Sequence, residues 1–583
     1  MNTGPDIASI DIVTIDIVKD SLLALSDEVF YVLARTSMSP IIYEVLDYAS
    51  GISDADGNLL TQGNGVTGFI GMLSPMIADT IKKHGKENMK PGDVFMINDP
   101  YMGGGSHPSD VGMVMPLFYN GEIVAFAANK AHWTEVGGMA AGSFTTDAKE
   151  IYQEGLRFSC VKLVDAGEII RSVVDIIRSN VRFPEMSLGD MWGQISALRI
   201  GFKRMGELCD KYHVDVVKAS MERLLKQGEA VSRNCLKGLK KGTFEMEDYM
   251  DDDGYGNTVK LRVKVTITDD EFIVDFTGSS PQVASPINTG YSSLCAGVKV
   301  VFMSVINPQM AVNDGVFRPL KVIAEKGSIF NCNPPAPTST YYESMLCATD
   351  LIWHALAETF PDRLTAGHYL SVCSVVMAGL HQDSGEPFLI VEPSCGGWGA
   401  GSDKDGEVGQ FCVANGETYN VPVEIAETRY GILVKEYSLN TDGTGAGEFR
   451  GGSGAVRVYK ALSDGQLFTA SFGRFKSAVW GVDGGGSGSH NFFEIIRADG
   501  TKEARRGIAA RIVLNKGDEA HLYTASGGGY GQAFKRPAAK VASDVKNGYI
   551  TSEQAAKDYG VILDGNHAVT GLTAERERSQ DPA

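Results

Sequence analysis

The dipeptide Asn120-Gly121, set between two apolar segments, constrains the local fold of this chain more than any other feature. The flanking segments, Val111–Phe118 and Glu122–Ala131, have the length and the β-branched and aromatic content of strands. Asn-Gly is favoured in two-residue type I′ turns because both central residues need a positive φ. The sequence therefore predicts an antiparallel β-hairpin closed at this dipeptide.

The register of this hairpin decides which polar residues lie side by side at its open end. In strict register Asp110 faces Ala131, and it points to the face opposite His132. Pro116 cannot donate a hydrogen bond to a neighbouring strand and favours a β-bulge, which shifts the register by one residue. With that bulge, the sequence predicts that Asp110 pairs with His132.

His107, Asp110 and His132 are therefore expected to lie close together. Two imidazoles and a carboxylate suit a divalent metal, zinc first with manganese or iron as alternatives, and three ligands leave positions open for water. The glycines before His107 permit a close approach of the backbone, and Asp99 is placed to orient a ligand histidine. The alternative is two ordinary histidines at strand ends. The residue pattern alone places no fourth ligand.

The composition of the chain excludes several classes of protein. Its 583 residues are 43% hydrophobic and 21% charged, which predicts a folded chain of more than one domain. A net charge of -19 repels phosphate backbones and argues against nucleic acid as a partner. We find no apolar run long enough for a membrane span and no signal-peptide pattern. We therefore expect no membrane partner and a cytoplasmic location.

Neither the cysteines nor the glycine-rich segments indicate a further cofactor site. The nine cysteines form no Cys-x-x-Cys pair, which argues against zinc fingers and a disulfide framework. Cys395 is interpreted as a buried reduced thiol rather than a nucleophile. Gly443–Gly454 and Gly527–Gly531 lack the strand, loop and helix order of a dinucleotide site. No P-loop sequence is present, so any ATP must bind elsewhere.

The hydrophobic pattern predicts an α+β protein of three domains. Residues 1–240 are expected to form a mixed α/β domain that carries the metal site and includes a helical segment. Residues 241–385 are expected to form a middle α+β domain. Residues 386–570 alternate short apolar strands with glycine-rich turns, which predicts an antiparallel β-rich domain. Residues 571–583 are predicted to be a disordered tail.

Several individual elements are predicted from periodicity. Helices are expected from Ile12 to about Ala34, from Gly68 to His84, and over much of Met191–Leu239. A further helix is expected over Asp350–Thr359. The acidic run Glu245–Asp253 is interpreted as a solvated turn rather than a calcium site.

Sequence blocks spread over residues 10–562 resemble the signature blocks of the hydantoinase B family. The first are Asn98-Asp99-Pro100-Tyr101 with His107 and Asp110, and then His132 with Gly137-Gly138. The others, in the same order as in the family, are Glu150–Arg157, Gly189-Asp190, Asp275–Gly278, Asn313–Gly315, Pro422–Glu424, Arg450–Gly454 and Tyr559–Val561. Related members include 5-oxoprolinases, N-methylhydantoinases, lactamases and subunits of acetone and acetophenone carboxylases.

The resemblance implies roles for particular residues. The metal ligands fall on His107, Asp110 and His132, and Asp47 matches an N-terminal acidic position that would add a ligand. Glu135 stands where the family has Asp in His-x-x-Asp-x-Gly-Gly, and its implied role is either a catalytic base or an acceptor that holds a histidine. The resemblance also implies a hetero-oligomer with a hydantoinase A-type subunit that hydrolyses ATP.

The implied function is ATP-dependent hydrolysis of a cyclic amide such as a hydantoin, a lactam or 5-oxoproline. The partner is expected to phosphorylate the amide oxygen, after which metal-bound water attacks the activated carbon. One alternative is a subunit of an ATP-dependent ketone carboxylase of the acetone or acetophenone type. Another is a non-catalytic scaffold subunit with a structural metal, which a fully protein-ligated ion would indicate.

Overall fold

The computed structural model describes residues 10–251, 253 and 255–580. The chain separates into two compact units, each built from three segments. The first comprises Met1–Glu247, Lys260–Thr349 and Ala414–Val421, and the second Asp248–Val259, Asp350–Val413 and Pro422–Ala583. This division differs from the three successive domains predicted with boundaries near 240 and 385, because segments distant in the sequence share a unit. The α+β fold class itself is confirmed.

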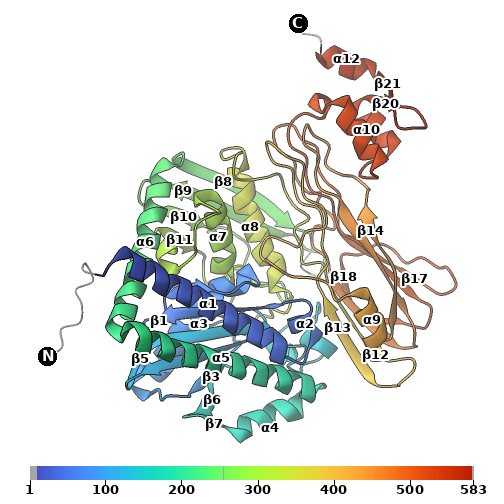
Figure 1. Ribbon diagram of the computed structural model, residues 1–583. Helices are drawn as coiled ribbons and strands as arrows, with labels where there is room; N and C mark the ends of the chain where they lie inside the picture. The colour runs from blue at the N-terminus through green and yellow to red at the C-terminus, as the bar shows by residue number, and fades with distance from the viewer. Residues whose placement is uncertain (1–9, 252, 254, 581–583) are drawn as a thin grey trace. The chain divides into compact units, whose positions relative to one another are not determined.

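A seven-stranded antiparallel sheet forms the framework of the first unit (Figure 1). Its strand order is β2-β1-β5-β4-β3-β6-β7. The strands are β1 (Tyr48–Asp54), β2 (Leu59–Gln62), β3 (Val94–Ile97), β4 (Asp110–Tyr119), β5 (Glu122–His132), β6 (Val161–Asp165) and β7 (Glu168–Ile169). The central strands β3, β4 and β5 are almost wholly buried, so this sheet is covered on both faces.

Helices cover the two faces of this sheet. On one face α1 (Ile12–Thr36) and α5 (Pro184–Tyr212) lie side by side (Figure 1), and Gly201 of α5 packs near Ile52 of β1. On the other face lies α3 (Thr67–His84), whose Leu73 approaches Gly51. Because Gly51 and Ile52 are consecutive and point to opposite faces, these contacts assign α1 and α5 to one layer and α3 to the other.

The bulged hairpin predicted from the sequence is confirmed. Strands β4 and β5 pair antiparallel, and their register shifts between Leu117 and Phe118. The extra residue of the bulge is Val124 of β5, close to Pro116, which cannot donate to the ladder. As a result Asp110 pairs with His132.

The first unit also contains further helices. Its further helices are α2 (Pro40–Tyr43), α4 (Arg171–Asn180), α6 (Val214–Gly238) and α7 (Tyr291–Ile306), with short 3-10 helices η2 (Lys86–Asn88), η3 (Ala141–Ser143), η4 (Ile151–Gln153) and η5 (Asp314–Phe317). Helix α7 packs on α3, where Gly71 leaves room for Ala296. The helix predicted over 350–359 is α8 (Tyr341–Ala357), which begins earlier than expected.

A second, four-stranded sheet has the order β11-β10-β9-β8. The strands are β8 (Gly242–Met250), β9 (Val259–Ile267), β10 (Phe272–Asp275) and β11 (Leu320–Ile323). Much of the acidic run interpreted as a turn is therefore strand, because β8 lies at an edge where acidic side chains reach solvent. Asp252 of that run lies outside the described residues.

The described part of the second unit contains two four-stranded antiparallel sheets, which confirms the predicted β-rich region. Their orders are β13-β12-β16-β18 and β14-β15-β19-β17. The strands are β12 (Ser374–Leu380), β13 (Pro387–Glu392), β14 (Ile432–Asn440), β15 (Gly454–Ala461), β16 (Gln466–Ser471), β17 (Phe492–Ile496), β18 (Ile508–Leu514) and β19 (Glu519–Tyr523). Helix α9 (Val423–Arg429) precedes β14.

The C-terminal segment is ordered where the sequence predicted a disordered tail. It contains η6 (Ala533–Lys535), α10 (Ala538–Lys546), α11 (Ser552–Tyr559), β20 (Val561–Leu563), β21 (Val569–Leu572) and α12 (Ala574–Gln580). Arg576 of α12 is buried, and its guanidinium donates to the carbonyls of Tyr559 (2.6 Å) and Arg536 (2.5 Å). The prediction for 571–580 was wrong because a charged side chain is used here for packing, and residues 581–583 lie outside the described residues.

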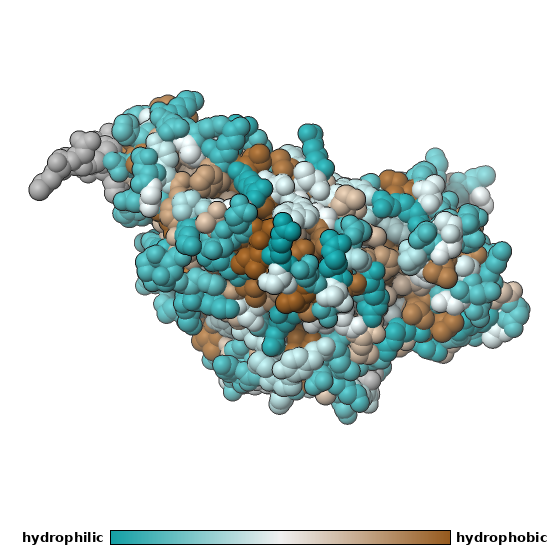
Figure 2. All heavy atoms as spheres, turned by 90° about the horizontal axis from the view of Figure 1, so that it is seen from below, coloured by the Kyte–Doolittle hydropathy of each residue, from teal (hydrophilic) through white to brown (hydrophobic). Residues whose placement is uncertain are grey.

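The surface of the described residues carries both polar and apolar side chains. On the face drawn in Figure 2, hydrophobic residues gather near the middle and hydrophilic residues surround them. Large exposed apolar side chains also lie on α1, among them Ile12, Val13 and Tyr31. None of the helices in the described part of the chain is long and apolar enough to cross a bilayer.

Candidate metal centre

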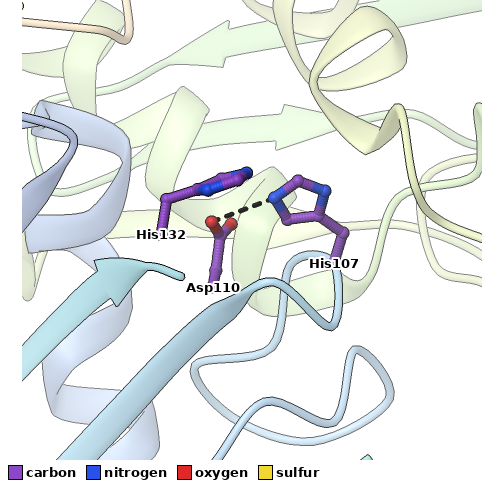
Figure 3. Close-up of side chains that lie close together, drawn as sticks. All are labelled: His107, Asp110 and His132. Atoms are coloured by element: carbon purple, nitrogen blue, oxygen red, sulfur yellow. Dashed lines mark hydrogen bonds and ion pairs between the residues drawn. The ribbon is translucent and has the colours of Figure 1, made fainter. Parts of the chain in front are cut away.

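The three residues that the sequence predicted as metal ligands converge at the open end of the β4–β5 hairpin (Figure 3). His107, Asp110 and His132 are all buried, and each offers one ligand atom within 4.8 Å of the others. The two imidazole rings lie 5.1 Å apart between centroids. This spacing suits a single ion bound by two nitrogens and one carboxylate oxygen.

The backbone sets this geometry. Asp110 is the first residue of β4 and His132 the last of β5, so their pairing places both side chains on the face that α3 covers. His107 lies in the loop before β4. In this loop the backbone at Gly105 lies against the backbone at Asp99. A Cβ at Gly105 would fall 1.8 Å from the carbonyl oxygen of Asp99, so only glycine fits there. The expectation of a close backbone approach before His107 is confirmed.

The hydrogen bonds of His107 fix which ring nitrogen faces Asp110. Its Nδ1 lies 2.8 Å from the carbonyl oxygen of Ser339, and a carbonyl can only accept, so Nδ1 carries the proton. In the neutral ring Nε2 is then unprotonated, yet it lies 3.0 Å from Asp110 Oδ1. Two electron-pair donors that face each other at this distance need a cation between them, either a proton or a metal ion.

His132 provides a second sign that the group is built for a cation. Its Nδ1 is buried and has no hydrogen-bond partner among the described residues. Burial, together with the neighbouring His107, lowers the pKa of His132 to about 4. A neutral imidazole with an unused nitrogen is the form that binds a metal. The residues present therefore fit a divalent ion.

Further polar groups support Asp110. Its Oδ2 accepts from the Ser106 hydroxyl, and its backbone carbonyl accepts from the ammonium of buried Lys130 at 2.8 Å. Burial would raise the pKa of Asp110, but the adjacent His107 holds it below its ordinary value. The ring of Tyr341, at the start of α8, lies 5.3 Å from that of His107. These contacts fix the carboxylate as a charged group that faces the histidines.

Asp47 lies beside the group but is not part of it. The backbone N–H of His132 donates to the Asp47 carbonyl at 3.0 Å, so the two residues are cross-strand neighbours. Burial and the charge of Asp110 raise the pKa of Asp47 well above its ordinary value. Among the described residues, the three-residue group does not include its carboxylate. Its role as an additional ligand stays a prediction.

Glu135 is held by a residue that the sequence did not indicate. Its carboxylate accepts from the backbone N–H of Arg182 at 2.9 Å and forms an ion pair with the Arg182 guanidinium. Burial raises the pKa of Glu135, and Arg182 opposes that rise. Neither expected role, a base or a support for a histidine, is seen in these contacts, because the carboxylate is engaged by Arg182.

The residue that supports His107 is also different from the one expected. Asp99 accepts from Tyr101 N–H at 3.1 Å and from the Ser159 hydroxyl, and among the described residues these bonds join its loop to the segment around Ser159 rather than to a histidine. His107 instead bonds Ser339, whose backbone N–H donates to Glu154 at 2.8 Å. Sequence reasoning missed this chain of contacts because Ser339 is far away along the chain. Glu154 did lie in a block that resembled the family.

Glu154 should make the stability of the first unit depend on pH. Burial raises its pKa from 4.5 to about 8, while the unfolded chain releases this proton at the ordinary pKa. The folded state therefore binds more protons between these values, and the free energy of unfolding falls as pH rises from about 4.5 to about 8. We expect Glu154→Gln to reduce this fall in urea unfolding measured at about pH 5 and about pH 8.

The control for this experiment is Glu168→Gln, which changes an exposed carboxylate on β7. The free energy of unfolding of this variant should depend on pH as it does in the wild type. An unchanged pH dependence in Glu154→Gln would show that Glu154 does not carry the effect.

Comparison with known proteins places the chain in one family. The family model described as hydantoinase B/oxoprolinase matches residues 11–533. The chain is 32% identical to a protein of Pseudomonas sp. (strain NS671) that is named as a subunit of a D-/L-hydantoinase, over 96% of both chains. It is 30% identical to the beta subunit of the caprolactamase of Pseudomonas jessenii, over 96% of this chain and 97% of the relative.

Solved structures agree with this assignment. The ATP-dependent caprolactamase of Pseudomonas jessenii matches 98% of this chain and 99% of its own, with a TM-score of 0.89 and 28% identity. A nucleotide-free acetone carboxylase shares the fold, with a TM-score of 0.89 at 18% identity over 97% of this chain and 82% of its own. The chain therefore belongs to the hydantoinase B/oxoprolinase family.

Proposed function

We propose that this chain is the metal-bearing subunit of an ATP-dependent hydrolase that opens cyclic amides. The observation that carries the proposal is the buried group in which His107 Nε2 faces Asp110 Oδ1 at 3.0 Å and His132 Nδ1 has no partner among the described residues. The relatives support the substrate class, since two are named as subunits of a hydantoinase and a caprolactamase. Hydantoins and lactams are both cyclic amides.

Zinc is the ion that we expect His107, Asp110 and His132 to hold, with manganese or iron as alternatives. Such an ion would supply a nucleophile at neutral pH by lowering the pKa of water. The chain itself contributes the rest. Ser339 holds His107 in the tautomer that leaves Nε2 free, and Ser106 and Lys130 orient Asp110.

The reaction we propose adds water across the amide bond. An oxygen from water bonds to the carbonyl carbon, the carbon–nitrogen bond of the ring breaks, and a proton goes to the nitrogen. Before this, ATP phosphorylates the amide oxygen and leaves as ADP, which removes the resonance that protects the ring. The phosphoryl group departs as inorganic phosphate, so the sum is amide, water and ATP giving amine, carboxylate, ADP and phosphate. Glu135 is left without an assigned step, since Arg182 already binds its carboxylate.

ATP is expected to be used by a partner of the hydantoinase A type. The chain contains no P-loop sequence, and its relatives are named as subunits.

The isolated chain should neither bind nor hydrolyse ATP. The physical reason is that no loop of the sequence has the residues that cradle phosphates in a P-loop. Calorimetric titration of the purified chain with Mg-ATP measures this directly. Tight nucleotide binding in the absence of a partner would contradict the proposal that the partner subunit binds and hydrolyses ATP.

Two other functions remain alternatives. A ketone carboxylase would use the same group to stabilise an enolate, and this chain shares the fold of acetone carboxylase. A scaffold with a structural metal is less well supported, because the group has three ligand residues and structural zinc sites usually have four.

The test of the proposed function is an activity panel with the purified pair. Ring opening and ATP consumption would be measured with 5-oxoproline, hydantoin, caprolactam, and acetone plus bicarbonate. We expect ATP-dependent opening of at least one cyclic amide and no carboxylation. If the pair carboxylates acetone and opens none of the rings, the proposed hydrolase function is wrong and the carboxylase function is supported.

A further inference from the structure

Glu154 is a buried carboxyl group that the proposed hydrolysis does not use. Its side chain is fully buried, and no ion pair joins it to a cation within the described residues. Its Oε1 accepts from two consecutive backbone N–H groups, those of Thr338 at 2.7 Å and Ser339 at 2.8 Å. A buried carboxyl group without a counter-ion is costly, so these two contacts indicate what the group does.

The backbone of Ser339 connects Glu154 with the metal group. Glu154 binds the N–H of Ser339, and the carbonyl of the same residue accepts from His107 Nδ1 at 2.8 Å. On the other side of the imidazole ring, His107 Nε2 lies 3.0 Å from Asp110 Oδ1. The position of the Ser339 carbonyl therefore sets the direction in which His107 Nε2 points.

Glu154 is itself held by the loop that follows β5. The backbone N–H of Met139 donates to the carbonyl of Gln153 at 2.8 Å, and that of Leu156 donates to the carbonyl of Val136 at 2.8 Å. These two bonds lie on either side of Glu154 in the sequence and fix the backbone that carries it. A side chain on a fixed backbone can determine where its partner lies.

Other contacts also hold the segment that contains Ser339. The Tyr101 hydroxyl donates to the Ala336 carbonyl at 2.6 Å. The backbone N–H of Thr145 donates to the Ser339 hydroxyl at 2.9 Å. Without Glu154 the chain should therefore still fold, but two buried N–H groups would have no partner. Such groups cost free energy until the backbone shifts or water enters, and either change moves the Ser339 carbonyl.

We propose that Glu154 is a positioning residue of the metal group, because it holds the Ser339 backbone whose carbonyl orients His107 for the ion. Glu154 acts through Ser339 and not on the substrate. The proposal rests on the metal group of the proposed function but not on the reaction, so it would apply equally to a carboxylase.

The first test measures the zinc affinity of the full chain at neutral pH by competition with a zinc-binding dye. Glu154→Ala should weaken zinc binding about 10- to 100-fold, the usual effect of removing a group that orients a metal ligand. Burial raises the pKa of Glu154 to about 8, so the acid is uncharged at neutral pH. Glu154→Gln should therefore bind zinc as the wild type does, because its Oε1 accepts from the same two N–H groups. Unchanged affinity in Glu154→Ala, or an equal loss in Glu154→Gln, would overturn the proposal.

Glu150→Ala separates positioning from a general loosening of the same loop. Glu150 is exposed, and its side chain caps the short helix η4, which ends directly before Glu154. This variant should lower the thermal midpoint without changing the zinc affinity. A loss of zinc affinity as large as that in Glu154→Ala would mean that the order of the whole loop controls the site, and the proposal would fail.

Glu154→Asp decides the test if Glu154→Ala does not fold. Its side chain is shorter by one methylene group, which withdraws the carboxyl group from the two N–H groups. Zinc affinity should again fall. Wild-type affinity in a folded Glu154→Asp chain would overturn the proposal.

A second measurement reports on His107 itself and needs no metal. In the metal-free chain with isotope-labelled histidine, the proton on His107 Nδ1 that donates to Ser339 should give an NMR signal, assigned by its absence in His107→Ala. The signal should persist in Glu154→Gln and disappear in Glu154→Ala. Its persistence in Glu154→Ala would contradict the role of Glu154. If the signal behaves as expected but the wild-type chain binds no zinc, the proposed metal centre is wrong while the positioning of His107 by Glu154 is supported.

Discussion

His132→Ala should empty the metal centre and abolish ring opening by the purified pair. His132 contributes the nitrogen that has no other partner in the described structure, so its loss leaves two ligands, His107 and Asp110. Two protein ligands hold a divalent ion far less tightly than three. The metal content measured by elemental analysis should fall from about one ion per chain to near zero.

The matched control is His490→Ala, which removes an exposed histidine of the second unit. It should retain both the metal and the activity. His107→Ala should behave like His132→Ala, because its Nε2 faces Asp110. Full metal occupancy in both ligand variants would rule out this group as the metal centre.

Asp110→Asn should stop ring opening while the partner continues to consume ATP. The substitution keeps the shape of the side chain but removes its charge, and Asn would present either a neutral oxygen or an N–H to His107. Weaker metal binding then depletes the nucleophile. ATP consumption should persist, because phosphorylation of the substrate is assigned to the other subunit.

Asp518→Asn is the control for this variant, since it neutralises a buried carboxylate that pairs with Arg497 in the second unit. It should leave ring opening unchanged. Loss of ATP consumption in Asp110→Asn together with loss of ring opening would indicate that the metal centre acts before phosphorylation. Normal ring opening in Asp110→Asn would remove Asp110 from the proposed chemistry.

The local geometry of the candidate site was predictable because it depends on neighbours in the sequence. Asn120-Gly121 sets the turn, and a bulge near Pro116 sets the register that pairs Asp110 with His132. Turn type and strand alternation are short-range effects that a sequence displays directly. That these residues bind a metal stays a prediction.

The rest of the site could not be predicted because it depends on tertiary contacts. The carbonyl of Ser339, which is distant in the sequence, accepts a hydrogen bond from His107. The backbone N–H of Arg182 donates to the carboxylate of Glu135. Nothing in the local sequence around either histidine encodes these partners. The same holds for the two units, each of which is assembled from separated segments, and for Arg576, whose burial orders a charged C-terminal helix.

Ring opening in oxygen-labelled water tests the central claim most directly. The wild-type pair would be supplied with ATP, a cyclic amide, acetone and carbon-labelled bicarbonate, and the products would be analysed by mass spectrometry. Hydrolysis predicts that the new carboxylate carries oxygen from the solvent. A product without solvent oxygen in that carboxylate, but with carbon from labelled bicarbonate, would contradict hydrolysis and establish carboxylation instead.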